Sequence, residues 1–179
     1  MKLVLGLFFD REYLKGRHFD EGLSGYIWGF RSIWTRNILR LAPPCRFPAN
    51  HQATISNSDR IEFHPDDLNN FQSPGTYLQN FAGNIRLGHG TYIAPNVGII
   101  TANHDPANLN QHIEAKDVII GESCWVGMNS IVLPGVTLGP RTIVGAGSVV
   151  TKSFPEGQCV IAGNPARVIK NLNESRNTS

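Results

Sequence analysis

The chain has 179 residues, of which 41% are hydrophobic and 17% are charged, a composition typical of one globular domain and not of a disordered segment. The net charge of +2 excludes a strongly basic nucleic-acid-binding protein. No apolar run approaches the roughly 20 residues that a membrane-spanning helix needs. Three cysteines, an odd number at unrelated spacings, exclude a regular disulfide framework and favour a reducing compartment.

Residues 1–50 are predicted to form a helical, basic and aromatic extension. They hold eight Lys or Arg and four Asp or Glu, a net of +4, whereas residues 51–179 hold eight and ten, a net of −2. The apolar start, residues 1–9, is followed by charged residues without a small-residue cleavage site, so we do not expect a signal peptide.

Residues 24–41 combine an apolar stripe at helical spacing with three arginines and no acid, and Pro43-Pro44 ends the pattern. The stripe consists of Ile27, Phe30, Trp34, Ile38 and Leu41, and the arginines are Arg31, Arg36 and Arg40. Two interpretations are open. The stripe is either the core face of a helix packed on the main domain, or the apolar face of a helix that lies on an anionic membrane surface.

A six-residue period dominates the second half of the chain. Every sixth residue in one stretch is a branched aliphatic: Ile120, Val126, Val132, Leu138, Val144 and Val150. The same spacing relates Leu87, Ile93 and Ile99, and Ile55 and Ile61 give a weaker hint of a first, irregular coil. Neither a strand nor an amphipathic helix has this period. It predicts a coil of short strands in which one aliphatic per hexad points inward and stacks on its equivalents in the next coil.

The hexads are interrupted once, because Ile99 and Ile120 are not separated by a multiple of six residues. We expect residues 100–117 to leave the coil as a projecting loop, and such loops often carry function. The predicted organisation is an extension over residues 1–50, a coiled domain over residues 51–170 and a polar tail over residues 171–179.

Three motifs then indicate a family: Ile93-Ala94-Pro95-Asn96, the run Gly145–Lys152 (GAGSVVTK) and the run Ala162–Ile169 (AGNPARVI). With the hexads, they make residues 76–170 resemble the hexapeptide-repeat acetyltransferases, in the branch of galactoside, maltose and polysaccharide O-acetyltransferases. The resemblance implies a mainly β fold, a left-handed parallel β-helix, a homotrimer, and acetyl-CoA bound in a groove between subunits. Residues 1–50 depart from the short helical cap of the galactoside enzymes. That extension and residues 66–71 look more like enzymes of capsule, exopolysaccharide or lipopolysaccharide modification.

The transfer of acetyl from a thioester to a hydroxyl needs a base, and His104 at the start of the projecting loop is the candidate. The family places its catalytic histidine here, just after the Ile-Ala-Pro-Asn coil. Asp105 either orients the imidazole or forms a turn with Pro106. Asn80 matches an asparagine that helps to hold the acceptor or the tetrahedral intermediate, with a turn-forming role as the alternative.

The resemblance also implies a set of acetyl-CoA-binding positions. Met128, Gly145, Ala146 and Thr151 match residues that line the family's groove, and Trp125 points outward beside an inward valine, where it either packs near the thioester or covers the adjoining loop. Lys152 and Arg167 are the cations that would meet the nucleotide phosphates, unless they are ordinary surface charges.

No metal is expected, because His89, His104 and His112 lack the spacing of three converging zinc ligands. No cysteine stands beside a base, so we do not expect a covalent acyl-cysteine intermediate. We therefore expect an acetyl-CoA-dependent sugar O-acetyltransferase that acts by direct transfer in the cytoplasm, with possible peripheral contact at the inner face of the membrane. An amino-sugar N-acetyltransferase and a non-catalytic trimeric scaffold remain the alternatives.

Overall fold

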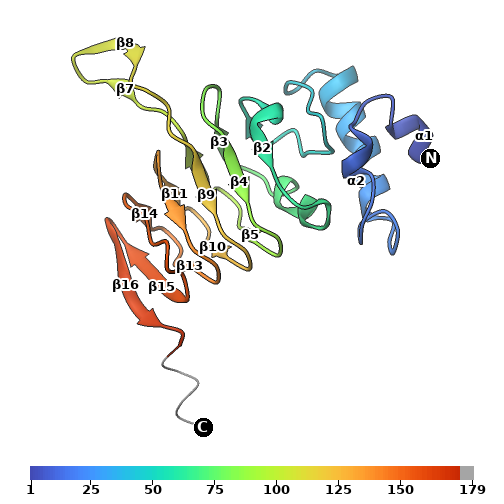
Figure 1. Ribbon diagram of the computed structural model, residues 1–179. Helices are drawn as coiled ribbons and strands as arrows, with labels where there is room; N and C mark the ends of the chain where they lie inside the picture. The colour runs from blue at the N-terminus through green and yellow to red at the C-terminus, as the bar shows by residue number, and fades with distance from the viewer. Residues whose placement is uncertain (174–179) are drawn as a thin grey trace.

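The computed structural model describes residues 1–173, and most of them wind into a coil whose sides are three parallel sheets (Figure 1). Sheet A contains β1 (Thr54–Ile55), β3 (Tyr77–Gln79), β6 (Gly98–Ile100), β11 (Ile131–Val132) and β14 (Val149–Val150). Sheet B contains β2 (Ile61–Glu62), β4 (Ile85–Leu87), β9 (Val118–Ile120) and β12 (Thr137–Leu138). Sheet C contains β5 (Tyr92–Ile93), β10 (Trp125–Val126), β13 (Ile143–Val144), β15 (Cys159–Gly163) and the antiparallel β16 (Ala166–Asn171).

The hexad aliphatics stack on one another as the six-residue period predicts. In sheet B, Ile120 lies opposite Leu87 on one side and Leu138 on the other. In sheet C, Val126 lies between Ile93 and Val144. Sheet A repeats the arrangement with Ile99, Val132 and Val150. Because each of these side chains has an aliphatic equivalent above or below it, the coil encloses one continuous apolar core.

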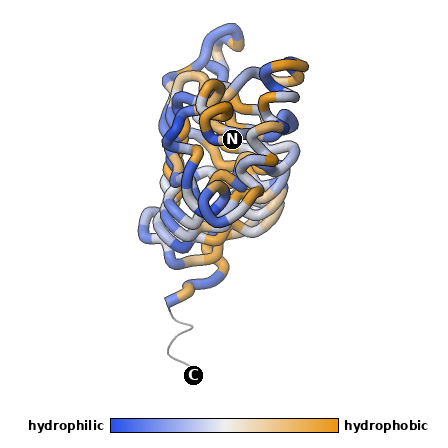
Figure 2. The backbone as a smooth tube through the Cα atoms, turned by 90° about the vertical axis from the view of Figure 1, so that its right-hand side faces the viewer, coloured by the Kyte–Doolittle hydropathy of each residue, from blue (hydrophilic) through white to orange (hydrophobic). Residues whose placement is uncertain are grey.

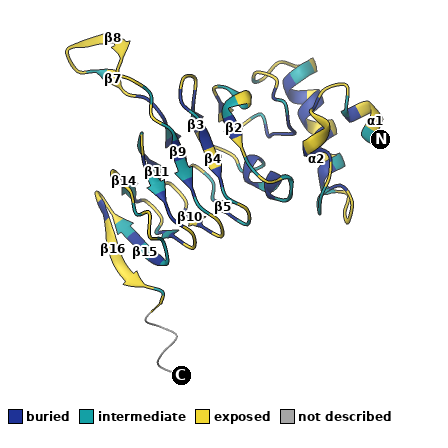
Figure 3. Ribbon diagram, in the orientation of Figure 1, coloured by how far each residue is buried: buried dark blue, intermediate teal, exposed yellow. Residues whose placement is uncertain are grey.

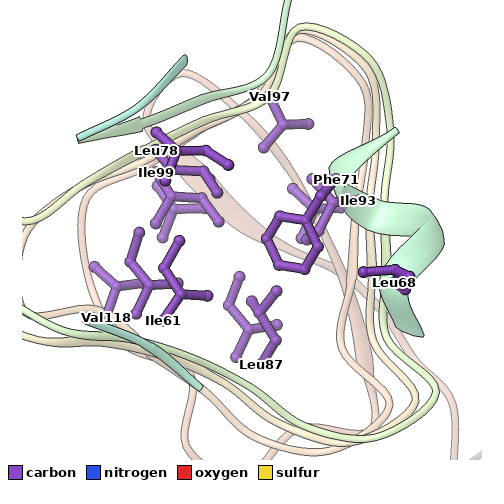
Figure 4. Close-up of a cluster of buried hydrophobic side chains, with 14 of the residues drawn as sticks. Ile61, Leu68, Phe71, Leu78, Leu87, Ile93, Val97, Ile99 and Val118 are labelled. Carbon is purple, nitrogen blue, oxygen red and sulfur yellow. The ribbon is translucent and has the colours of Figure 1, made fainter. Parts of the chain in front are cut away.

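The strands of the coil contain many buried residues (Figure 3). Inside the coil, their apolar side chains point toward one another and form the core (Figure 4). The first coil is irregular, as the weak hexad signal there indicates. A 3-10 helix, η4 (Pro65–Phe71), occupies the place of the first sheet C strand, and its Leu68 and Phe71 fill the core. A shorter 3-10 helix, η3 (Ser58–Arg60), joins β1 to β2.

The coils approach closely at their corners, where small residues recur in the sequence. A Cβ added to Gly139 would lie 2.1 Å from the carbonyl oxygen of Pro155, and one added to Gly121 would lie 2.8 Å from the backbone of Gly139. No side chain fits at such distances, so glycine is required at both positions by the neighbouring coil.

The interruption of the hexads is a β-hairpin that projects from the coil (Figure 1). Its strands are β7 (His104–Asp105) and β8 (Asn108–His112), which pair antiparallel with His104 opposite His112. The predicted projection over residues 100–117 is therefore confirmed, and its internal structure, which the sequence pattern left open, is a two-stranded ribbon.

The N-terminal extension is helical and covers the first coil. It contains α1 (Lys2–Leu5), the 3-10 turn η1 (Arg11–Tyr13), α2 (Ser24–Ser32) and a π-helical continuation, η2 (Ile33–Ile38). Phe47 of the segment that follows packs on Tyr13, Phe63 and Phe71, which joins the extension to the core of the coil.

The apolar stripe of residues 24–41 faces away from the protein, so the interpretation of the stripe as a core face is wrong. Its five members are 43–63% exposed. The buried face of α2 and η2 is instead made mainly of small and polar residues: Gly25, Gly29, Ser32, Thr35 and Arg36, together with Ile33. Gly29 gives Leu5 room, because a Cβ there would lie 3.0 Å from the leucine side chain.

Arg36 shows why a polar face can pack inward here. Its side chain is fully buried, and its nitrogens donate to the carbonyl oxygens of Ala49 at 3.2 Å, Asn50 at 2.7 Å, Ala53 at 2.6 Å and Pro43 at 2.6 Å, and to the sulfur of Cys45 at 3.4 Å. Burial lowers the pKa of the guanidinium. Arg36 therefore anchors the extension to the first coil through hydrogen bonds and is not a surface cation.

Among the described residues, no helix is long and apolar enough to cross a bilayer. Six of the nine residues of the predicted polar tail, 174–179, lie outside the described part of the chain.

Candidate functional site

The root of the projecting hairpin is held by the carboxyl end of β3. The Gln79 side chain accepts from the backbone N–H groups of Thr101 and Ala102, each at 3.1 Å, and donates to the Ala102 carbonyl at 3.1 Å. Two backbone hydrogen bonds join the segment that leaves the coil to the segment that returns to it: Lys116 N donates to Thr101 O, and Ile113 N donates to Asn103 O. His104 therefore projects from a fixed base.

The contacts of His104 determine which of its nitrogens is free. Its Nδ1 lies 2.7 Å from the carbonyl oxygen of Leu109. A carbonyl oxygen only accepts, so Nδ1 carries the hydrogen in the neutral ring and Nε2 carries the lone pair. Within the described residues, the hydrogen bonds of the ring leave Nε2 without a protein partner, and the side chain is exposed. This is the arrangement that a general base needs.

The His112 ring packs beside His104, and Phe81 in turn packs on His112. The His112 ring lies 4.3 Å from the His104 ring, centroid to centroid, and Phe81 meets His112 edge-on at 4.9 Å. These contacts join the hairpin to the turn between β3 and β4. Because the Leu109 carbonyl and the His112 ring both restrain the imidazole, its orientation is set before any substrate arrives.

Asp105 does not orient the imidazole in this structure. Its Oδ1 accepts from the backbone N–H of Ala107 at 2.8 Å, which is the turn role left open by the sequence. The orienting partner of His104 is the Leu109 carbonyl instead.

Asn80 lies just after β3 but presents nothing to solvent. It is fully buried, its Oδ1 accepts from Asn57 N at 3.1 Å, and its Nδ2 donates to Asn57 O at 2.6 Å. The amide is thus bonded in both directions to the neighbouring coil, and its burial keeps its remaining hydrogen-bonding capacity away from the surface. The structure thus favours a structural role for Asn80 over the acceptor-binding role that the resemblance implied.

At the root of the hairpin, the returning segment is fixed by Asp117, immediately before β9. Its Oδ1 accepts from Asn84 N at 2.8 Å, and its carboxylate also accepts from the Asn84 side chain. The backbone hydrogen bond from Asn84 is the main reason that the pKa of Asp117 lies below its ordinary value.

The predicted acetyl-CoA-binding residues fall at two different corners of the coil. Thr151 and Lys152 follow β14 at the carboxyl edge of sheet A, the edge from which the hairpin also leaves. Met128 follows β10, and Gly145 and Ala146 follow β13, at the corner between sheets C and A. Within one chain, the predicted acetyl-CoA-binding residues therefore lie on opposite edges of sheet A.

The remaining members of the set lie around the second corner. Arg167 is on β16 opposite Ala162, and a Cβ on Gly145 would lie 2.9 Å from the Ala162 methyl group. Trp125 is exposed on the outer face of sheet C beside Tyr92, its strand partner. At the first corner, the Lys152 ammonium lies 5.6 Å from the centre of the Phe154 ring. Both cations are exposed, and Arg167 Nη1 donates to the Ala166 carbonyl oxygen at 3.0 Å.

One group of described residues has the composition of a metal site: His64, Asp66 and His89 bring ligand atoms within 4.8 Å of one another. However, His89 Nδ1 faces the carboxylate of the buried Asp67 at 3.3 Å, and His64 Nδ1 accepts from Asp66 N at 3.3 Å. Both nitrogens thus have protein partners, and the group lies at the corner between sheets B and C, away from the hairpin.

The cysteines do not supply a nucleophile. All three are buried, and burial raises the pKa of the Cys45, Cys124 and Cys159 thiols. A thiol with a raised pKa is largely protonated at neutral pH and reacts poorly.

The sequence pattern missed two elements of the site, the Leu109 carbonyl and His112. Every residue has a backbone carbonyl, so the identity of residue 109 could not indicate that its carbonyl would bond to His104. His112 becomes visible only when residues 100–117 are read as a hairpin, because antiparallel pairing then brings it opposite His104.

Comparisons with known proteins agree with the hexapeptide coil. Residues 117–152 match the bacterial transferase hexapeptide family (six repeats). WcaF of Escherichia coli (strain K12), provisionally named a colanic acid biosynthesis acetyltransferase, is 42% identical over 88 residues, which are 49% of this chain and 48% of that protein. The resemblance to hexapeptide-repeat acetyltransferases is thereby confirmed.

Solved structures extend the similarity to the fold. A galactoside acetyltransferase in complex with coenzyme A superposes with a TM-score of 0.53 at 28% identity, covering 72% of this chain and 66% of that chain. A hexapeptide-repeat acetyltransferase of Vibrio cholerae O1 biovar eltor, complexed with acetyl-coenzyme A, gives 0.50 at 30% identity, covering 53% and 52%. The coil is a left-handed parallel β-helix. The chain spans about half the length of the curated relatives it matches.

Proposed function

We propose that the protein is an acetyl-CoA-dependent O-acetyltransferase that acts on a sugar hydroxyl, in the modification of a bacterial capsule, exopolysaccharide or lipopolysaccharide. The observation that carries the proposal is the state of His104, whose Nδ1 is bonded to the Leu109 carbonyl while Nε2 is free. The names of the relatives supply the acyl donor and the acceptor class.

In the proposed reaction, His104 moves one proton. The acceptor oxygen forms a bond to the acetyl carbonyl carbon while its proton passes to Nε2. The bond between that carbon and sulfur then breaks, and the imidazolium returns the proton to the departing thiolate, so that the ring ends neutral. The Leu109 carbonyl favours this cycle, because it stabilises the protonated ring through the Nδ1–H bond and keeps Nε2 aimed outward.

We also propose that the working assembly is a homotrimer with acetyl-CoA between subunits, as the resemblance implies. The separation of the binding positions supports it. Met128 and Ala146 lie at one corner of the coil, whereas Lys152 lies at the corner that carries the hairpin. A groove between two copies would place one corner of each chain on the same ligand.

An acceptor screen tests the proposed class. Purified full-length protein is incubated with acetyl-CoA and a panel of sugars, nucleotide sugars, amino sugars and oligosaccharides, and released thiol is followed. We expect a hydroxyl acceptor to raise release above the hydrolysis background. Mass spectrometry of the product then separates an O-acetyl ester from the N-acetyl amide that the amino-sugar alternative predicts.

The screen is paired with a measurement of acetyl-CoA binding, because an absence of thiol release could reflect either a missing acceptor or a failure to bind acetyl-CoA. Acetyl-CoA that binds without turnover on any member of the panel would argue for a polymeric or lipid-linked acceptor. A protein that neither turns over nor binds acetyl-CoA would contradict the proposal and leave the scaffold interpretation.

A further inference from the structure

We propose that the N-terminal extension is a docking face for an anionic lipid surface. The face consists of the exposed apolar side of α2 and η2, with Leu39 and Leu41 after them, and the exposed apolar side chains of α1. The inference is independent of the reaction at His104, because it rests on residues outside the coil.

The first observation is where apolar surface gathers. Of the 21 large apolar residues exposed in the described chain, twelve lie within residues 1–41, and only nine are spread over the remainder. On α2 and η2 they are the five stripe residues, and on and after α1 they are Leu3, Val4, Leu7 and Phe8. The view onto this end of the molecule shows hydrophobic segments beside the N-terminus (Figure 2).

This exposure is not a consequence of a poorly packed extension. The opposite side of the same helix is tightly joined to the protein by the five hydrogen bonds of Arg36 and by the contact of Gly29 with Leu5. The stripe therefore cannot turn inward without breaking those contacts. Single exposed apolar residues are ordinary, but a group of them held outward on one helix face is typical of an interaction surface.

The charges around the face select the partner. Residues 24–41 contain no acid, and Arg31 and Arg40 of this segment are exposed. Arg31 donates to the side-chain oxygen of Gln72 at 2.9 Å, and because that amide is neutral the charge of Arg31 stays uncompensated. Three of the four acids of the extension are already in ion pairs: Asp10 and Glu12 with Arg46, and Asp20 with Lys2. An apolar face on a segment that also carries arginines whose charge is not compensated is complementary to anionic headgroups over acyl chains.

The aromatic residues fit the same partner. Trp34 and Phe30 are both more than 40% exposed within the stripe. Tryptophan at a membrane boundary places an amphipathic ring at the level of the headgroups. In the proposed contact, α2 and η2 lie in the plane of the interface, as a helix with one apolar and one polar face does.

Vesicle co-sedimentation of the full-length protein tests the proposal. We expect it to sediment with vesicles of phosphatidylglycerol and phosphatidylcholine and much less with phosphatidylcholine alone. Ile27→Glu with Ile38→Glu should reduce the bound fraction at least tenfold, because two carboxylates would enter the apolar face. Arg40→Gln should weaken binding to the anionic vesicles about fivefold.

The matched control is Ile169→Glu at the opposite end of the chain. Ile169 is 65% exposed and Ile27 is 63% exposed, so Ile169→Glu matches Ile27→Glu in chemistry and exposure and differs from it in location. Ile27→Glu alone is therefore measured beside the double variant and should already weaken binding. The control should bind vesicles as the unmodified protein does. Circular dichroism and thermal unfolding of each variant show whether the helices remain folded.

Three results would overturn the proposal. The unmodified protein could fail to bind anionic vesicles at low salt. The Ile169→Glu control could lose binding as fully as the double variant does. Finally, light scattering could show that the double variant changes the oligomeric state while vesicle binding is absent, which would make the face an interface between copies of the chain.

Discussion

The coil and the N-terminal extension use apolar periodicity in opposite ways. In the coil, the residues that recur every sixth position point inward and are almost fully buried, as with Ile120 and Val126. In the extension, the residues that recur at helical spacing point outward, and a glycine, serine and arginine face takes their place against the protein.

The difference shows what a period can and cannot determine. A repeated hexad has equivalents above and below it, and only the inside of the coil lets those equivalents stack, so the direction follows from the period itself. A single helix has no such neighbours. Its spacing identifies an apolar stripe, but whether the stripe meets the protein or another surface depends on what the opposite face can bond to, here the carbonyls around Arg36.

The largest contrast should come from one substitution made in both regions. Ile120→Gln places an unpaired amide in the core and removes the contact with Leu87 and Leu138, so we expect a loss of about 4 kcal/mol in the free energy of unfolding. Ile38→Gln should change it by less than about 0.5 kcal/mol, because that side chain is 57% exposed. Urea titrations of both variants measure this, and similar losses at the two sites would refute the contrast.

Arg36 gives the next largest effect and sharpens the account of the inward polar face. Arg36→Ala leaves buried carbonyl oxygens without donors, so we expect a loss of about 3 kcal/mol. The matched change at the exposed Arg40, Arg40→Ala, should cost less than about 0.5 kcal/mol. If Arg36→Ala unfolded at the same denaturant concentration as Arg40→Ala, the arginine would not be what holds the extension in place.

The smallest effect concerns the root of the hairpin and depends on pH. The pKa of Asp117 is lower in the folded protein than its ordinary value, chiefly because Asn84 N donates to it, so its contribution to stability is present above about pH 4 and is lost as the pH falls. The Asp117→Ala variant should be less stable by under about 1 kcal/mol at pH 7, because the carboxylate is partly exposed. That difference should shrink as unfolding is measured toward pH 3, and a difference that grew with acidity would contradict the assignment.

The sequence allowed much of the coil to be predicted and only part of the site. The hexads located the inward aliphatics, and the break between Ile99 and Ile120 located the projection that carries His104. The hydrogen bond from His104 to the Leu109 carbonyl could not be predicted, because the order of side chains in a sequence does not show which backbone group a side chain will meet. Asn80 was placed in the site by resemblance, and only its contacts with Asn57 reveal its use within the coil.

Acceptor-dependent thiol release by His104→Ala, with acetyl-CoA affinity measured in parallel, decides whether His104 is the base. We expect turnover to fall by about 100-fold or more with the affinity unchanged. His89→Ala is the matched control, since it removes an exposed histidine from another corner of the coil and should retain turnover. Turnover by His104→Ala at the unmodified rate, or a loss of acetyl-CoA binding with the chemistry intact, would contradict the assignment of His104 as the base.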